Sequence, residues 1–115
     1  MQLVNLTNGT VLAHRIEVAN SFKKRLRGLI GRSALKQGEA MVLLPCKSVH
    51  TCFMKFPIDV VFVNKEDVVI RVIESLKPFM FSPIIPHSHI VFELPAGRLA
   101  ATGTMEGHRL QIKFF

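Results

Sequence analysis

The sequence predicts a mainly β fold, a compact antiparallel sandwich or barrel with one amphipathic α-helix. Short runs rich in Val, Ile and Phe recur along the chain, and prolines, which cannot donate into a sheet ladder, separate several of them. Only one stretch carries apolar residues at clear helical spacing. At 115 residues, 49% of them hydrophobic, residues 1–115 are expected to form a single domain with its own core.

The N-terminal segment predicts a β-hairpin. Asn8-Gly9 separates apolar-rich stretches at residues 1–7 and 10–19, and both turn residues tolerate the positive φ angles of a type I′ turn. The segment lacks the basic and long apolar regions of a secretory signal. Since no apolar run approaches the roughly 18 residues that suggest a membrane span, we expect a cytoplasmic protein whose two cysteines are free thiols.

The predicted helix begins after Ser21 (or Asn20), a suitable N-cap, and ends at Gly31, which can adopt a left-handed conformation. Its apolar residues fall on one helical face: Phe22, Leu26, Leu29 and Ile30. We expect this apolar stripe to cover the sheet.

The rest of the chain predicts strands at residues 40–44, 49–54, 58–63, 68–75, 90–94 and 109–115. The polar turn Asn64-Lys65-Glu66-Asp67 predicts a second hairpin. Three prolines predict a loop over residues 78–87, and residues 96–102 could form one or two helical turns closed by Gly103.

The net charge of +7 is concentrated in one local patch, on the predicted helix and just after it. Six basic residues follow Phe22 with no acidic residue among them: Lys23, Lys24, Arg25, Arg27, Arg32 and Lys36. Such a patch could bind the phosphates of a nucleic acid, rest on an anionic membrane, or be a solvated face. No Tyr or Trp is present to stack on bases, and the apolar stripe is expected to face the sheet instead of a membrane.

Three ionisable residues stand out as candidates for a functional site. Asp59 and Glu93 lie in apolar strands, where a carboxylate is costly unless it is paired or borders a wet site. His50 could meet Asp59 across the bend at residues 53–57, either as a general base or in a structural hydrogen bond. An ion pair of a carboxylate with Arg27 or Lys55 is the structural alternative.

Several separated sequence motifs follow one another in the order that is typical of one known family. They are Arg27-Gly28-Leu29-Ile30-Gly31-Arg32 followed by Leu35, Gly38 and Met41, then residues 50–63, then Glu93-Leu94-Pro95-Ala96-Gly97, and finally Gly103 with Gly107. Over about residues 22–115, after the N-terminal hairpin, this set resembles the domain-of-unknown-function family numbered 192. The resemblance implies a compact β sandwich or barrel with one helix, and it implies no activity.

The chain departs from the family's pattern at two positions. His108 stands where an Asp is usual, and Ala40 stands where a second glycine is frequent. We interpret the missing Asp as a turn residue, since Asp is a common turn former.

Metal and nucleophile chemistry have weak support. Cys46, His50 and Cys52 have a Cys-x3-His-x-Cys spacing, which provides only three ligands and matches known zinc patterns poorly. His50 would share a strand face with Cys52 instead of lying beyond it as a base. No phosphate-binding loop, serine elbow or paired-histidine helix is found in the sequence. We expect no cofactor.

The leading hypothesis is a non-enzymatic module that binds a polar or anionic ligand or a partner segment. Its proposed site comprises Arg27 as the anion contact, Gly28, His50, Asp59 and Glu93. One alternative is a small hydrolase that uses His50 with Asp59 or Glu93. A second alternative is nucleic-acid binding through Lys23, Lys24, Arg25, Arg32 and Lys36.

Overall fold

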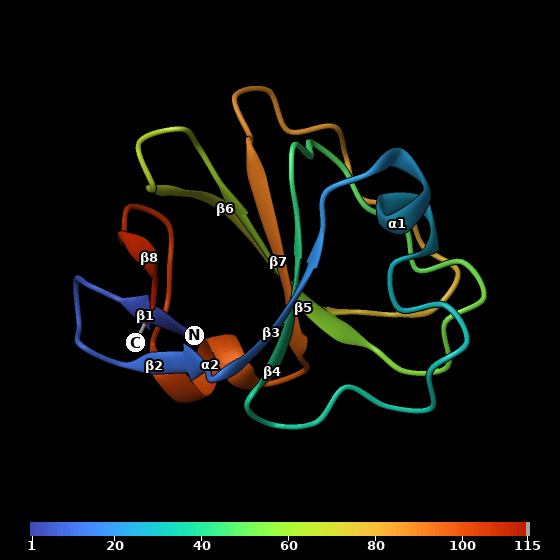
Figure 1. The fold of residues 1–115 in the computed structure, drawn as a ribbon, viewed down its shortest axis with the longest axis horizontal. Helices are drawn as coiled ribbons and strands as arrows, with labels where there is room; N and C mark the ends of the chain where they lie inside the picture. Colours follow the sequence, from blue (N-terminus) through green and yellow to red (C-terminus); the bar gives the residue numbers. More distant parts are fainter. Residues whose placement is uncertain (115) are drawn as a thin grey trace.

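Two β-sheets pack face to face in the computed structural model, which describes residues 1–114 (Figure 1). The elements in chain order are β1 (Gln2–Asn5), β2 (Val11–Ala13), β3 (Arg15–Ala19), α1 (Phe22–Arg27), β4 (Glu39–Leu43), β5 (Ile58–Val63), β6 (Val69–Leu76), β7 (Ile90–Pro95), α2 (Arg98–Thr102) and β8 (Leu110–Lys113). The fold is therefore mainly β, as predicted.

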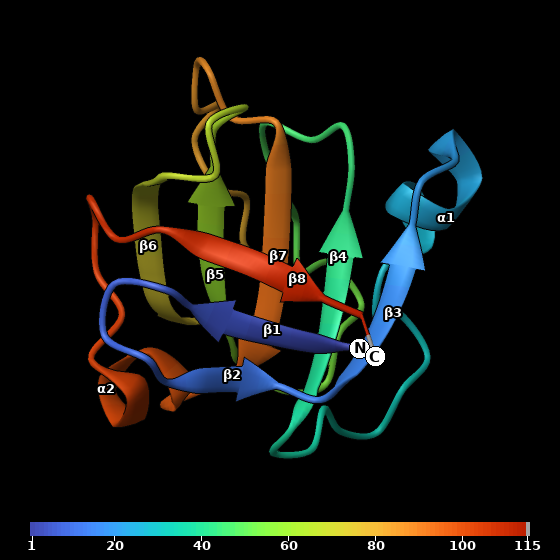
Figure 2. The same cartoon turned by 60° about the vertical axis from the view of Figure 1, so that its left-hand side comes forward.

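The small sheet has the order β2-β1-β8, and the large sheet has the order β3-β4-β7-β5-β6. Figure 2 shows the small sheet crossing in front of the large one. All strand pairs are antiparallel except β3 with β4, which are parallel. The expectation of a wholly antiparallel sheet is thus corrected at this edge, where the chain passes through α1 before it returns as β4.

The large sheet is buried on both faces. Side chains alternate along its central strands, so successive residues enter two different cores. Val61 and Phe92 belong to the core between the two sheets. Val60 and Val91 belong to a second core on the opposite face, which also includes Leu29 from the loop that follows α1. This double burial explains why β5 is a continuous apolar run interrupted only by Asp59.

Most predicted strands are confirmed within a residue or two, and both hairpins are found. In the first hairpin Gly9 has a positive φ but Asn8 does not, so the expected type I′ turn is wrong, and residues 10–19 divide into β2 and β3, which lie in different sheets.

The helical turn near residues 96–102 is α2, which ends at Gly103 in a left-handed conformation. The predicted strand at residues 49–54 is wrong. There, only His50 forms an isolated bridge, to Phe81, since the segment pairs with a neighbouring loop instead of joining a sheet.

The helix α1 differs most from its prediction. It ends at Gly28, whose φ of 49° and ψ of −124° stop the helix three residues before Gly31. No residue within α1 is buried, and Phe22 and Leu26 are 74% and 57% exposed. The expectation that the apolar stripe covers the sheet is therefore wrong, and only Leu29, beyond the helix end, enters the core. None of the described helices is long and apolar enough to cross a membrane.

Candidate functional site

A cavity of about 370 Å³ lies between α1, the segment that follows β4, and β7. Its apolar walls come mainly from Phe22, Leu26, Leu29, Leu43, Val49 and Met54. Its ionisable groups are Arg25, Arg27, Cys46, Lys47, His50 and Glu93. The cavity thus combines an apolar body with several polar groups, as small-molecule sites do. It brings together four of the five predicted site residues, Arg27, Gly28, His50 and Glu93.

Glu93 is the most unusual polar residue of this cavity. It lies in the middle of β7, paired with Val60 on one side and Met41 on the other, and it is only 2% exposed. Its Oε1 atom is buried and has no hydrogen-bond partner among the described residues. Burial raises the pKa of Glu93 to about 8. The side chain is therefore mostly a neutral carboxylic acid at pH 7.

Gly28 brings main chain close to this carboxyl group. Its φ and ψ angles of 49° and −124° are accessible in practice only to glycine. A Cβ atom at Gly28 would lie 3.8 Å from Glu93 Oε1, an ordinary contact distance. Glycine is thus required for the backbone conformation, and this conformation places the end of α1 beside the acid.

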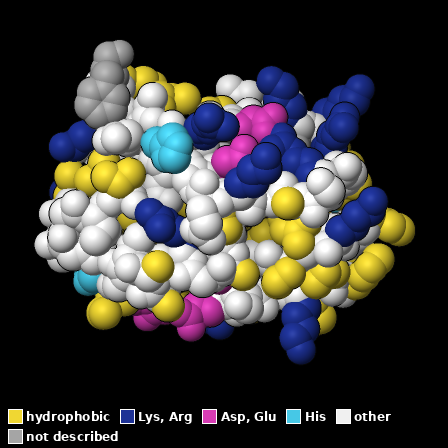
Figure 3. Space-filling model, turned by 90° about the horizontal axis from the view of Figure 1, so that it is seen from below, with side chains coloured by type: hydrophobic (Ala, Val, Ile, Leu, Met, Phe, Trp, Pro, Cys, Tyr) yellow, Lys and Arg dark blue, Asp and Glu magenta, His cyan; other side chains and the backbone are white. Residues whose placement is uncertain are grey.

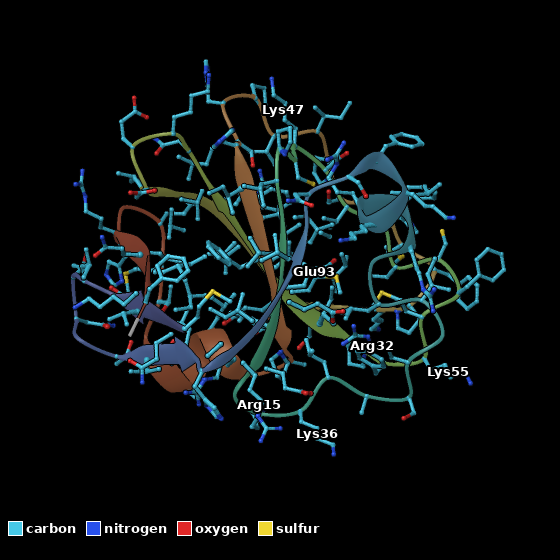
Figure 4. All side chains as sticks on the ribbon, in the orientation of Figure 1. Arg15, Arg32, Lys36, Lys47, Lys55 and Glu93 are labelled. Carbon is cyan, nitrogen blue, oxygen red and sulfur yellow. The ribbon has the colours of Figure 1, made fainter. Side chains whose placement is uncertain are left out.

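Neither buried carboxylate forms the ion pair that we considered as the structural alternative. Within residues 1–114 the ion pair found is Arg32 with Glu17, at the surface. Figure 4 shows Glu93 in the interior, whereas Lys47 and Lys55 lie at the periphery. The Glu93 side chain thus has no cation as a direct partner in the described part of the chain.

His50 has both of its ring nitrogens engaged by main-chain groups. Nδ1 accepts a hydrogen bond from the Cys52 N–H at 3.2 Å, so the proton must reside on Nε2. Nε2 then donates to the Leu26 carbonyl at 3.1 Å. The ring therefore fastens the segment that contains Cys52 to α1, and its described hydrogen bonds go to neither carboxylate.

Asp59 lies outside the cavity lining. Its Oδ2 accepts hydrogen bonds from the N–H groups of Gly97 and Leu99 at 3.1 and 2.9 Å, and its Oδ1 accepts from that of Ser75 at 2.9 Å. Asp59 is fully buried and paired in register with Leu94, a residue of the core between the sheets. Glu93 is one position away and points to the other face. The two carboxylates therefore lie on opposite faces of one sheet.

Cys46 is a cavity residue that sequence reasoning did not place here. It follows the strand β4, and its thiol donates to the Ser48 carbonyl at 3.0 Å. Burial raises the pKa of the Cys46 thiol, and the nearby Glu93 adds to the effect. Both cysteines are free thiols, and no cluster of three His, Cys, Asp or Glu side chains suited to a metal occurs in residues 1–114.

Arg25 was predicted only as part of the basic patch, yet it also borders the cavity. Its Nη1 donates to the Leu44 carbonyl at 3.3 Å, which ties α1 to the end of β4. The sequence between Phe22 and Gly28 could not predict this hydrogen bond, because the bond depends on how α1 lies against the end of β4.

The comparisons with known proteins agree with this fold. A family model, DUF192, described as Uncharacterized ACR, matches residues 3–112 and so also includes the N-terminal strands. A UPF0127 protein from Pyrococcus furiosus is 33% identical over 95% of this chain and 96% of its own length. A UPF0127 protein from Thermococcus sibiricus is 29% identical over 83% of this chain and 64% of its own length.

Two solved structures resemble the protein at low sequence identity. A protein of unknown function from Novosphingobium aromaticivorans has a TM-score of 0.84 and 21% identity, with 96% of this chain and 82% of that chain covered. A "putative transcription regulator" from Sinorhizobium meliloti has a TM-score of 0.78 and 22% identity, with 96% and 89% covered. At such identities the likeness establishes the fold alone.

Proposed function

The chain belongs to the DUF192 family, whose description carries no activity, and we propose that it binds a small ligand in the cavity beside Glu93. The observation that carries this proposal is the buried Oε1 atom of Glu93, which has no partner among the described residues. A buried polar atom without a hydrogen bond costs about 1–3 kcal/mol. A ligand that donates a hydrogen bond to this atom would remove that cost.

The cavity also suggests the chemistry of the ligand. Its apolar walls favour a molecule with a hydrocarbon body, while Glu93 favours a hydroxyl or amine group at the inner end. Arg25 and Arg27 border the same space and would attract an anionic group at the outer end. A small hydroxy acid or amino acid with an apolar side chain combines these three features.

Binding is favoured over acid–base catalysis by the hydrogen bonds of the candidate residues. His50, the histidine that lines the cavity, has both ring nitrogens occupied by main-chain groups. Asp59 uses its oxygens to hold three N–H groups elsewhere in the fold. A hydrolase that combines His50 with Glu93 would require His50 to break its two main-chain hydrogen bonds, and one that combines His50 with Asp59 would require both residues to break theirs.

A thermal-shift screen with small hydroxy acids, amino acids and amines tests the proposal. A ligand at 100 times its Kd stabilises a protein by about 2.7 kcal/mol, enough for a clear rise in Tm. We expect Glu93→Gln and Arg27→Ala to reduce the shift, whereas the matched surface variants Glu66→Gln and Arg71→Ala should retain it. No shift with any compound, or equal shifts in all four variants, would contradict the proposal.

Nucleic-acid binding remains a second proposal, supported by the basic residues that surround α1. Arg32 pairs with Glu17 and Arg25 contacts a main-chain carbonyl, which leaves Lys23, Lys24 and Lys36 as the candidate phosphate contacts. Binding to a mixed oligonucleotide should weaken steeply as salt is raised. Absence of binding at low ionic strength would remove this proposal.

A further inference from the structure

We propose that the end of the molecule that carries α1 docks on an anionic lipid bilayer. This surface adjoins the cavity, with which it shares Phe22 and Leu26, and is formed by three segments: α1, the loop at residues 50–56 and the loop at residues 77–85. Figure 3 shows hydrophobic side chains gathered at this end of the molecule, with Lys and Arg at their edges. We call it the docking surface.

The docking surface displays large apolar side chains that the fold does not bury. They are Phe22, Leu26, Phe53, Phe79, Met80, Phe81 and Ile84, with exposed fractions between 48% and 74%. Single exposed apolar residues are common in proteins, but a group from adjoining loops marks an interaction site.

The two loops are fastened to one another, so their aromatic rings form one surface. The Thr51 N–H donates to the Met80 carbonyl, and the Met80 N–H donates to Thr51 Oγ1, both at 2.9 Å. The rings of Phe53 and Phe79 meet edge to face, with centroids 5.7 Å apart. His50 lies beside Phe81, with ring centroids 6.3 Å apart, and its bond to Leu26 attaches α1 to the same unit.

The backbone conformation of two of these phenylalanines supports a role of their exposed rings in binding. Phe53 and Phe79 have φ angles of 63° and 62°, in the left-handed region that bulky residues seldom adopt. Both rings nevertheless remain mostly exposed, so the unfavourable conformation is not compensated by burial in the core. Such conformations concentrate at functional sites.

The charge of the docking surface identifies its partner. The three segments, α1 and residues 50–56 and 77–85, contain six Lys and Arg residues and no Asp or Glu. Lys55 and Lys77 flank the two aromatic loops, and Lys23 and Lys24 belong to α1. Apolar rings that enter the interfacial region, surrounded by cations that contact lipid phosphates, are the two elements of peripheral membrane binding.

Vesicle flotation tests the proposal with the intact protein. We expect binding to phosphatidylcholine vesicles that contain about one third phosphatidylglycerol, and much weaker binding to pure phosphatidylcholine. The double variant Phe79→Ser/Phe81→Ser should weaken binding by about tenfold or more through lost ring insertion. Lys55→Glu/Lys77→Glu should also weaken it, and about 0.5 M NaCl should weaken binding of the unaltered protein.

Matched variants elsewhere provide the controls. Phe114 is 76% exposed near the end of β8, and Lys65 lies in the β5–β6 turn. Phe114→Ser and Lys65→Glu should leave vesicle binding unchanged, and circular dichroism should show that all variants fold.

Three outcomes would overturn the proposal. They are no binding of the folded protein to anionic vesicles, equal binding in the ring variants, and concentration-dependent dimerisation that the ring variants abolish. The last outcome would assign the docking surface to a second copy of the chain. Ligand shifts in the cavity screen do not require lipid, so failure here leaves that proposal separately testable.

Discussion

The main chain at Gly28 lies against the carboxyl group of Glu93, and a Cβ atom there would stand 3.8 Å from Oε1. Glu93 belongs to the central strand β7, whereas Gly28 ends the exposed helix α1. The contact joins the sheet to α1, the helix that borders the cavity. It also explains how a carboxyl group can be 2% exposed and yet face a space large enough for a ligand.

Glu93→Gln should change how stability depends on pH. The folded state raises the pKa of Glu93 to about 8, well above its value in the unfolded chain. The stabilisation from this group is therefore complete below about pH 4 and is lost as pH rises toward 8, at about 1.4 kcal/mol per pH unit.

Urea denaturation of both proteins at several pH values measures this effect. The unfolding free energy of the unaltered protein should fall relative to that of Glu93→Gln between about pH 5 and pH 8. Parallel curves for the two proteins would show that Glu93 titrates normally.

Asp59→Ala should destabilise the fold without altering the cavity. The change leaves the N–H groups of Ser75, Gly97 and Leu99 without their acceptor, which we expect to cost about 3–5 kcal/mol. Asp59→Asn retains one oxygen for the two α2 donors and should cost less. Chemical denaturation measures both, and a loss below about 1 kcal/mol for Asp59→Ala would refute this structural role.

Gly28→Ala should destabilise through backbone strain, since its Cβ would meet no atom closer than 3.8 Å. We expect a loss of about 1–3 kcal/mol. Semisynthetic replacement by D-alanine, which favours these φ and ψ angles, is the matched control and should be nearly neutral. A neutral effect of the L-alanine variant would mean that the end of α1 can adopt another conformation.

Alkylation of Cys46 reports on the cavity directly. Burial raises the pKa of this thiol, so in a Cys52→Ser background N-ethylmaleimide should react more slowly than with the urea-unfolded chain at pH 7. The reaction should accelerate at higher pH, and a bound ligand should slow it further. Cys46→Ser isolates the reaction of Cys52 as the control, and equal folded and unfolded rates at Cys46 would contradict its placement.

The strands and hairpins were predictable because their signals are local. The Val- and Ile-rich run of β5 and the polar turn after it specify a hairpin without reference to the rest of the chain. The turn that contains Asn8 and Gly9 likewise joins β1 and β2.

The relation between the two buried carboxylates was not predictable. Alternation along one strand assigns relative faces within that strand only, and comparison of Asp59 with Glu93 requires the register between β5 and β7. That register pairs Glu93 with Val60, so Asp59 lies on the opposite face, where it accepts a hydrogen bond from the main chain of α2. The polar residues were correctly singled out, but only three-dimensional pairing separates their roles.

The helix was predicted from the spacing of its apolar residues, which identifies its apolar face but does not identify the part of the protein that this face contacts. The apolar positions of α1 do fall on one side, yet Phe22 and Leu26 border the cavity and stay exposed instead of packing on the sheet. In the segment around Thr51, bonds to Met80 replaced the expected sheet pairing. Both failures arise from contacts between distant segments.

The pKa of Glu93 itself is the most direct test, measured by carbon-13 NMR of side-chain carboxyl groups and assigned by the signal that Glu93→Gln removes. The ligand-free protein should show one glutamate with a midpoint near 8. A midpoint near the usual 4.3 would mean that Glu93 is solvated or already hydrogen-bonded, and the proposed binding site would lose its basis.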